Sequence, residues 1–318
     1  MNRILVFTPP EDQSRRAIAL ASDLALETGA SLTLLRVLEE TAGWPSLQGS
    51  LQAEQRMRDL LVETAARELE ALADLVREKT DQRVEVSTEI SWGVPWEVVI
   101  ELVQAHHFDL VVKPARGTSN SGRVFFGTTA LHLFRRCPCP VWVVGNDGKL
   151  PRRMLVAIDP TLDRTRRNMA SRLLDWSGRV RGLANADLHV ASAWHAPGAE
   201  ILKDKIDRED WDRYVRDCRE RAETALEALL HESAGGRVLD QTHLLEGHAR
   251  DVIPEFAESG DFDLLVVGAV GRTGVAGELL GETAESIVRA VQCSVLVVSQ
   301  GRAVVSDRAP SRGRTGRS

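Results

Sequence analysis

Five glycines within a sixteen-residue segment give the clearest chemical signal in this sequence. The segment follows an apolar run and precedes residues 282–285, where we expect a helix to begin. Glycines leave backbone N–H groups open to a ligand, and a helix start adds partial positive charge, so the segment is suited to bind an anion or a phosphate. The alternative is that some of these glycines only permit tight turns. They are Gly268, Gly271, Gly274, Gly277 and Gly281.

The segment matches neither of two well-known phosphate-binding motifs. It does not end in the Gly-Lys-Ser/Thr of a P-loop. The Gly-x-Gly-x-x-Gly fingerprint of dinucleotide-binding folds follows a first strand, whereas this segment follows the fourth strand expected in its half of the chain. The sequence therefore indicates a phosphate-type site outside those two classes.

The chain contains a duplication. Residues 93–144 align without a gap on residues 247–298, and 17 of the 52 pairs are identical. Chance matching at ordinary residue frequencies would give about three or four identities. One domain was therefore copied, and any site that it holds is expected twice unless one copy has lost it.

Apolar runs alternate with helical stretches in the same order in both halves. A parallel sheet covered on both faces gives this pattern, because its strands are buried on each side. We expect strands at 3–8, 31–37, 83–90, 108–112 and 141–144, and again at 153–158, 187–193, 238–245, 264–267 and 295–298. Helices are expected at 13–27, 51–79, 94–105, 128–136 and 207–232, with others between the remaining strands.

The predicted fold class is α/β: two tandem, doubly wound, five-stranded parallel-sheet domains of Rossmann-like type, packed as a pseudo-dimer. We place the first domain at 1–145 and the second at 152–300, joined by a polar linker. The basic residues 301–318 lack periodicity and are expected to form a disordered tail. In such domains ligands bind beyond the carboxyl ends of the strands.

Composition limits the function classes. The 318 residues are 43% hydrophobic and 27% charged, with a formal net charge of −6, which argues against a general nucleic-acid binder. No apolar run reaches the length of a membrane span, and no secretory signal is visible, so a cytoplasmic location is expected. The four cysteines do not form a disulfide framework. No catalytic motif stands out, so the sequence does not predict an enzyme.

The glycine spacing resembles that of the universal stress protein family, whose nucleotide-binding members carry Gly-x2-Gly-x9-Gly followed by a helix and a last strand. Gly268, Gly271 and Gly281 fall on this spacing, and Gly117 and Gly127 match it in the first half. The resemblance covers about residues 1–300. It implies an adenine nucleotide alpha hydrolase-like fold, binding of ATP or AMP, with Mg²⁺ if ATP is bound, and a role in stress response. The candidate site is Asp159 at adenine, with Gly268, Gly271, Arg272, Gly281 and Thr283 around the phosphates.

The first half departs from the family pattern at two positions. Pro9 stands opposite Asp159, and Pro114 stands opposite Gly268. Proline offers no side-chain acceptor, and its ring blocks close approach of a ligand. The first half is therefore expected to have a degenerate nucleotide site. Lys113 and Arg116 are interpreted as a solvated basic edge, with attraction of an anion as the alternative.

The second half departs at one position, because Glu282 replaces the Ser or Thr of the family pattern. A carboxylate at a helix start is favoured by the helix dipole and would repel a phosphate. Arg272, Thr283 or a bridging Mg²⁺ would offset this repulsion. Nucleotide binding is therefore expected to be weak or conditional.

Three alternatives stay open at this stage. Asp159 would also serve as the cap of the helix that follows it. Drifted sites would leave a module that binds a partner protein or a small apolar ligand through Trp-rich clefts, and a homodimer is compatible with the sequence. Slow ATP hydrolysis would need a water-positioning group that the sequence does not identify. Cys137, Cys139 and Cys293 are interpreted as buried, inert thiols rather than a metal or redox site.

Overall fold

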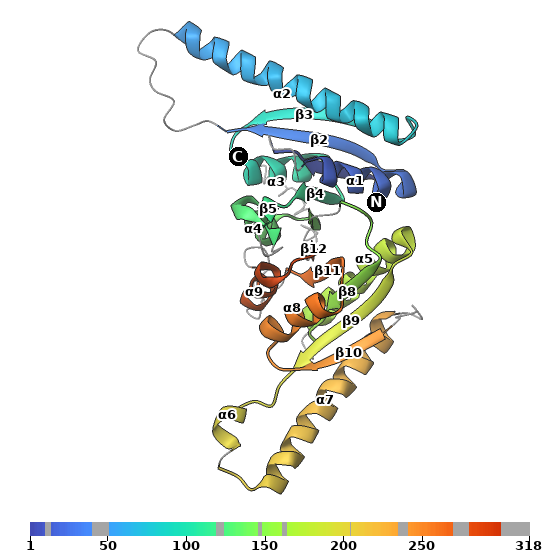
Figure 1. Cartoon of the computed structure of the whole chain (residues 1–318), viewed down its shortest axis with the longest axis vertical. Coiled ribbons are helices and arrows are strands. Elements are labelled where there is room, and N and C mark those ends of the chain that lie inside the picture. Colours follow the sequence, from blue (N-terminus) through green and yellow to red (C-terminus); the bar gives the residue numbers. More distant parts are fainter. Residues whose placement is uncertain are drawn as a thin grey trace, which may run out of the picture.

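The structure is a computed structural model (Figure 1) that describes residues 1–9, 14–39, 51–118, 124–145, 148–160, 164–203, 205–234, 241–269 and 280–299. The basic segment 301–318, for which the sequence predicts disorder, lies outside these residues. Within them, each half contributes five strands to the main sheet, as predicted.

The first half supplies parallel strands in the order β3-β2-β1-β4-β7, and the second half repeats this order as β10-β9-β8-β11-β12. The strands of the first half are β1 (Arg3–Phe7), β2 (Ser31–Leu38), β3 (Val86–Trp92), β4 (Leu110–Pro114) and β7 (Val141–Val144). Those of the second half are β8 (Arg153–Ala157), β9 (Asp187–Trp194), β10 (Gln241–Glu246), β11 (Leu264–Gly268) and β12 (Ser294–Val298). A separate two-stranded hairpin joins β5 (Gly117–Thr118) to β6 (Val124–Phe125).

The two halves meet edge to edge and form one ten-stranded sheet. β7 and β12 pair antiparallel, with Trp142 opposite Leu296. All other neighbours in this sheet are parallel. The predicted α/β pseudo-dimer is confirmed, and its two sheets are continuous across the seam.

Helices cover both faces of the sheet. One face packs against α1 (Ser14–Thr28), α2 (Leu51–Lys79), α5 (Arg164–Ala184) and α7 (Arg208–Ala234). The other packs against α3 (Pro95–His106), α4 (Gly127–Arg136), α8 (Ala249–Ser259) and α9 (Glu282–Ala290). The short α6 (Ala199–Leu202) precedes α7. α2 and α7 lie at the two far ends of the molecule, beside the edge strands (Figure 1).

The predicted start of the third strand is wrong, and backbone geometry explains the difference. β3 begins at Val86 rather than at residue 83. Asp81 and Gln82 have φ values of 49° and 57°, in the left-handed region. The Arg83 N–H then donates to the Thr80 carbonyl at 3.0 Å, so a turn after α2 takes up the first predicted residues of the strand.

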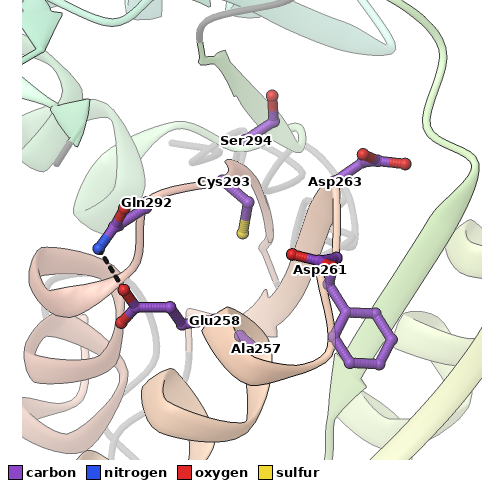
Figure 2. Close-up of a pocket in the computed structure, with 8 residues that line it drawn as sticks. Ala257, Glu258, Asp261, Asp263, Gln292, Cys293 and Ser294 are labelled. Carbon is purple, nitrogen blue, oxygen red and sulfur yellow. Dashed lines mark hydrogen bonds between the residues drawn. The ribbon is translucent and has the colours of Figure 1, made fainter. Parts of the chain in front are cut away.

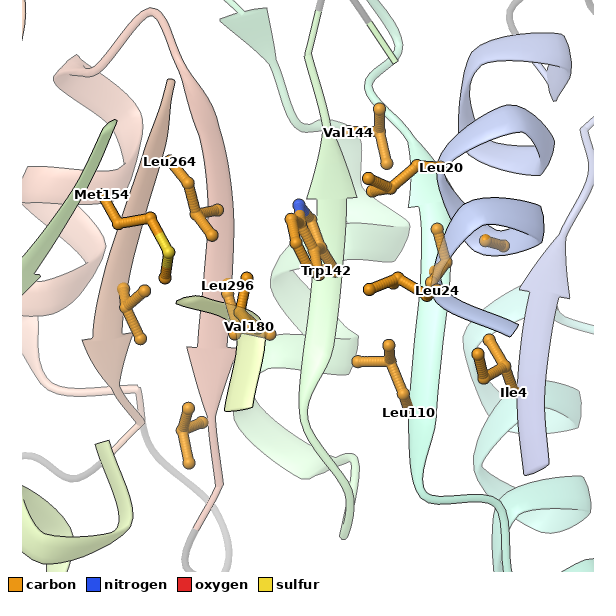
Figure 3. Close-up of a cluster of buried hydrophobic side chains, with 14 of the residues drawn as sticks. Ile4, Leu20, Leu24, Leu110, Trp142, Val144, Met154, Val180, Leu264 and Leu296 are labelled. Carbon is orange, nitrogen blue, oxygen red and sulfur yellow. The ribbon is translucent and has the colours of Figure 1, made fainter. Parts of the chain in front are cut away.

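The core continues across the seam between the halves. Trp142 lies in the middle of this seam and is only 1% exposed (Figure 3). Two polar contacts add to the apolar packing: the Gly145 N–H donates to Ser294 Oγ, and Ser299 Oγ donates to the Pro138 carbonyl, both at 3.0 Å. On each face of the sheet, the buried apolar residues of the two halves therefore form one continuous cluster.

The duplicated Phe-Asp-Leu motif has a structural role. Asp109 accepts hydrogen bonds from the backbone N–H groups of Asn2 and Arg3, at the start of β1. Asp263 does the same for Arg152 and Arg153, at the start of β8. Each aspartate thus anchors the first residues of the neighbouring strand, which explains the motif without a ligand.

The paired glycines at 93 and 247 also have a structural explanation. Gly93 has φ +141° and Gly247 has φ +133°, values that other residues rarely adopt. A Cβ atom at Gly247 would lie 2.5 Å from Val252 Cγ1. The turn from the third strand to the next helix therefore requires glycine in this copy.

None of the described helices is both long and apolar enough to cross a membrane.

Candidate functional site

The carboxyl ends of β8 and β11 lie side by side, because these strands are parallel neighbours with Val156 opposite Val266. Asp159 follows the end of β8 by two residues, and Gly268 is the last residue of β11. The structure therefore brings these two candidate residues to one edge of the sheet. In open parallel sheets this is the edge that binds ligands.

Asp159 is exposed at this edge. The residue before it, Ile158, is buried, and its N–H still donates to the Ala191 carbonyl at 2.9 Å. The chain thus leaves the sheet at Asp159. An exposed carboxylate here is able to accept hydrogen bonds from an exocyclic amine.

Gly268 has a packing role that sequence reasoning missed. A Cβ atom at this position would lie 2.7 Å from Met169 Cγ and 3.1 Å from Met169 Sδ, both in α5. The first of these distances is too short for a stable contact, so a side chain at 268 would force Met169 to move. Close approach of α5 therefore explains this glycine as well as close approach of a phosphate does.

The start of α9 stands at the same end of the fold. Its N-cap residue Gly281 is extended, with φ −59° and ψ 142°, and no side-chain cap is found among the described residues. Glu282 and Thr283 are exposed in the first turn. No residue in the described part of the chain forms an ion pair with Glu282.

Glu285, one turn further along, is held by arginines from both halves. Arg135 Nη2 lies 2.6 Å from Glu285 Oε2, and Arg289 Nη2 lies 2.9 Å from Glu285 Oε1. The hydrogen bond from Arg135, supported by Arg289, lowers the pKa of the Glu285 carboxyl. Arg135 and Arg289 are equivalent in the duplication, 154 residues apart. This trio links the two halves and leaves Glu285 with a structural role.

Two predicted site residues, Gly271 and Arg272, lie outside the described residues. The described part of the candidate site is therefore Asp159, Gly268, Gly281 and Thr283.

Lys113 corrects an expectation. We interpreted it as part of a solvated edge, but it is only 4% exposed. Its Nζ donates to the Pro114 carbonyl at 2.6 Å and to the Phe126 carbonyl at 3.5 Å. Burial, with a smaller contribution from the charge of Arg116, lowers the pKa of Lys113 to about 8.

The strand pattern itself contained a signal for the burial of Lys113. Lys113 lies two residues from Val111 and two from Ala115, so in a strand it shares their face of the sheet. Val111 and Ala115 face the layer of α3 and α4. In a strand covered on both faces, a polar residue between two such positions is buried with them. Arg116, just beyond the strand, is exposed as expected.

A pocket of about 450 Å³ opens at the opposite edge of the sheet, near the amino ends of β11 and β12 (Figure 2). Its polar groups are largely engaged: Gln292 Nε2 donates to Glu258 Oε1 at 2.7 Å, and Asp263 anchors β8. Cys293 lines this pocket and is partly exposed, so the expectation that it is fully buried is wrong. The pocket and the predicted nucleotide site lie at different ends of the strands.

The other two thiols are buried as expected. Cys137 Sγ and Cys139 Sγ lie 3.6 Å apart. The contact with Cys137 and burial raise the pKa of the Cys139 thiol, which disfavours the reactive thiolate. Within the described ranges, no group of three or more His, Cys, Asp or Glu side chains is placed to hold a metal ion.

Comparison with known proteins gives consistent matches across the chain. The model of the universal stress protein family matches residues 1–145 and 151–299. The chain is 26% identical over 307 residues to a universal stress protein E homolog of Haemophilus influenzae, covering 94% of this chain and 97% of that protein. It is 30% identical over 227 residues to universal stress protein E of Salmonella typhi, covering 68% and 69%.

Solved structures agree with this result. A universal stress protein from Pseudomonas aeruginosa UCBPP-PA14 superposes with a TM-score of 0.67 and 26% identity, covering 94% of this chain and 93% of that one. A universal stress protein from Archaeoglobus fulgidus gives a TM-score of 0.63 at 17% identity, covering 94% and 99%, and supports the fold alone.

Proposed function

Because this chain belongs to the universal stress protein family, we propose that it is a stress-response regulatory protein that binds an adenine nucleotide, ATP or AMP, in its second half. One observation carries the proposal: Asp159, after the end of β8, and Gly268, at the end of β11, lie at the same edge of the sheet. The proposal includes a cytoplasmic location and a division into domains at 1–145 and 152–300. The first domain has lost its nucleotide site.

Each candidate residue has a chemical role in this proposal. Asp159 accepts a hydrogen bond from the exocyclic amine of adenine. The uncapped N–H groups at the start of α9 face the phosphates, together with the backbone of Gly268 and Gly281. From the sequence, Gly271 and Arg272 complete the phosphate site. Mg²⁺ accompanies ATP and reduces its repulsion by Glu282.

The role of Asp159 is tested with the full chain. Asp159→Ala is expected to weaken binding of Mg-ATP and AMP about tenfold in calorimetry, the size expected for a hydrogen bond to a charged group. Asp187→Ala is the matched control, because Asp187 is also exposed but lies at the amino end of the neighbouring strand β9. Denatured wild-type protein should release adenine into the filtrate. Failure to bind either nucleotide, with no adenine released, would refute the proposal.

The charge of Glu282 leads to a second prediction. Glu282→Ser is expected to strengthen ATP binding about fivefold, because removal of an exposed charge a few ångströms from a phosphate is worth about 1 kcal/mol. AMP, with less charge, should gain less. Glu255→Ser changes an exposed glutamate of α8 and serves as the control. Equal or weaker ATP binding by Glu282→Ser in calorimetry would show that this carboxylate does not oppose the phosphates.

Exposed apolar side chains support a second function, the binding of a partner protein. Leu60 in α2 is 58% exposed, and Ile201 in α6 is 63% exposed. The tryptophans give less support to binding in an apolar cleft, because two of them are already covered by protein. Trp142 is buried, and the ring of Trp96 stacks on that of His132, with 4.7 Å between the ring centroids. A chain that releases no adenine and shows no thermal shift with Mg-ATP would favour this second function.

A further inference from the structure

We propose that two copies of this chain form a dimer through residues 54–64 of α2, which pair side by side and antiparallel. Each copy contributes Met57, Leu60 and Leu61 to the contact. This surface lies at the outer end of the first half, so the dimer does not depend on nucleotide binding in the second half.

The first argument is that this segment projects from the fold. α2 passes the end of the sheet where Arg58 lies over Trp92, the last residue of β3, with 5.3 Å between the guanidinium carbon and the ring centroid. Figure 1 shows the start of α2 reaching beyond the strands. Side chains 54–64 are exposed or partly exposed, and Ala65 is the first buried residue after them. Among the described residues, the segment therefore has little support from its own chain.

The second argument is the apolar content of the segment. Met57, Leu60 and Leu61 are 43%, 58% and 40% exposed. Together with Thr64 they follow the spacing i, i+3, i+4 and i+7, so they lie on one face of the helix. None of the three apolar side chains belongs to the two apolar clusters on the faces of the sheet. Because most helical stability in proteins comes from packing of such a face, this face is suited to a second helix.

The second half shows how one chain supports a helix start of this kind. α7 follows the second strand of its half as α2 does in the first. Tyr214 Oη in α7 donates to the Pro197 carbonyl at 2.8 Å, just before α6, and the Tyr214 ring lies 6.0 Å from that of Trp211. Both aromatic side chains are half-buried. In the described part of the first half, the start of α2 instead keeps the three exposed apolar side chains, which leaves them to a partner.

The third argument identifies the partner as a second copy. Arg56 and Glu63 are exposed surface neighbours of Leu60, one helical turn before it and one after it. When two copies pair antiparallel about Leu60, Arg56 of each copy lies beside Glu63 of the other, and the two leucines meet at the twofold axis. Parallel pairing would place like charges together. Glu63 lies 3.7 Å from Arg67 of its own helix, in an exposed pair that uses one carboxylate oxygen. The charges therefore match in an antiparallel, twofold pair, the commonest symmetry of homo-oligomers.

The size of the contact predicts a weak dimer. The segment is about 15 Å long at a rise of 1.5 Å per residue. Val94, which is 46% exposed and lies two residues after Trp92, adds apolar area beside Arg58. Interfaces that bury less than about 1,200 Å² in total are typical of transient complexes. We therefore expect a dissociation constant of about 10–100 μM.

The test is sedimentation equilibrium of the full chain at concentrations that bracket this range. Wild type should show a monomer–dimer equilibrium. Leu60→Glu should weaken dimerisation about tenfold or more, because it places two carboxylates at the twofold axis. Ile201→Glu is the matched control: Ile201 is 63% exposed but lies in α6 of the second half, so the dissociation constant should not change. Both side chains are exposed, and circular dichroism checks that each variant keeps its helix content.

A charge exchange tests the antiparallel register. Arg56→Glu and Glu63→Arg should each weaken dimerisation about threefold, because each brings like charges together at two symmetric positions. The two changes combined should restore the wild-type dissociation constant within about twofold, since opposite charges face each other again. A chain that stays monomeric at every concentration, a dimer that is equally stable in Leu60→Glu, or a combined variant no better than the single ones would overturn the proposal. Loss of the dimer in Ile201→Glu would also overturn it and would place the contact on α6.

Discussion

Replacing Trp142 with alanine is expected to lower the free energy of unfolding by about 3–5 kcal/mol, the usual cost of truncating a large buried aromatic side chain. Trp142 is 1% exposed, and β7 places it opposite Val112 of β4 on one side and Leu296 of β12 on the other. Truncation would leave a cavity between strands of different halves (Figure 3). Urea unfolding followed by circular dichroism measures the loss.

Two controls test whether the loss comes from this cavity. Trp142 Nε1 is buried without a hydrogen-bond partner among the described residues, so Trp142→Phe removes an unpaired polar group and should cost much less than Trp142→Ala. Trp211→Ala, at a half-buried position on α7, should also cost less. A loss in Trp142→Ala no larger than in Trp211→Ala would show that the seam is not tightly packed.

The continuous sheet also predicts that the two halves unfold cooperatively. Because the main sheet and its core run through both halves, we expect wild type to unfold in one transition. The ion pairs of Glu285 with Arg135 and Arg289 add to the same seam. Apolar burial contributes most of this coupling, since surface ion pairs are worth about 0–1 kcal/mol and these two are only partly buried.

Most of the fold was predictable because duplication and alternation of elements are strong signals. The helix 51–79 was predicted with the bounds that α2 has, since its charged face and its buried Leu69, Ala73 and Val76 follow helical spacing. The joining of the two sheets was not predictable. β7 and β12 are buried apolar strands. The sequence pattern of such a strand is the same whether its neighbour is parallel, antiparallel or in the other half.

The candidate site was predictable in its location and less so in its details. Parallel strands place Asp159 and Gly268 at one edge, a consequence of topology alone. The contact of Gly268 with Met169 depends on how α5 crosses the sheet, which a sequence pattern does not encode. The burial of Lys113 was missed because its charge was given more weight than its place between two buried positions.

Lys113→Met is expected to stabilise the protein by about 1–3 kcal/mol at pH 7 in chloride buffer. Burial lowers the pKa of Lys113 from 10.5 to about 8, which corresponds to about 3 kcal/mol of destabilisation while both folded and unfolded chains are protonated. Methionine keeps most of the apolar stem and removes the charge. Loss of the hydrogen bonds to the Pro114 and Phe126 carbonyls offsets part of the gain.

The pH dependence of this gain identifies its cause. The folded-state pKa lies below the unfolded one, so between about pH 8 and 10.5 the unfolded chain binds more protons and wild-type stability rises with pH. The advantage of Lys113→Met should therefore be about 2 kcal/mol smaller at pH 9.5 than at pH 7. Lys149→Met, which changes an exposed lysine, should show no such trend in the same urea unfolding series. A difference between Lys113→Met and wild type that stays constant from pH 7 to 9.5 would contradict a buried, uncompensated ammonium.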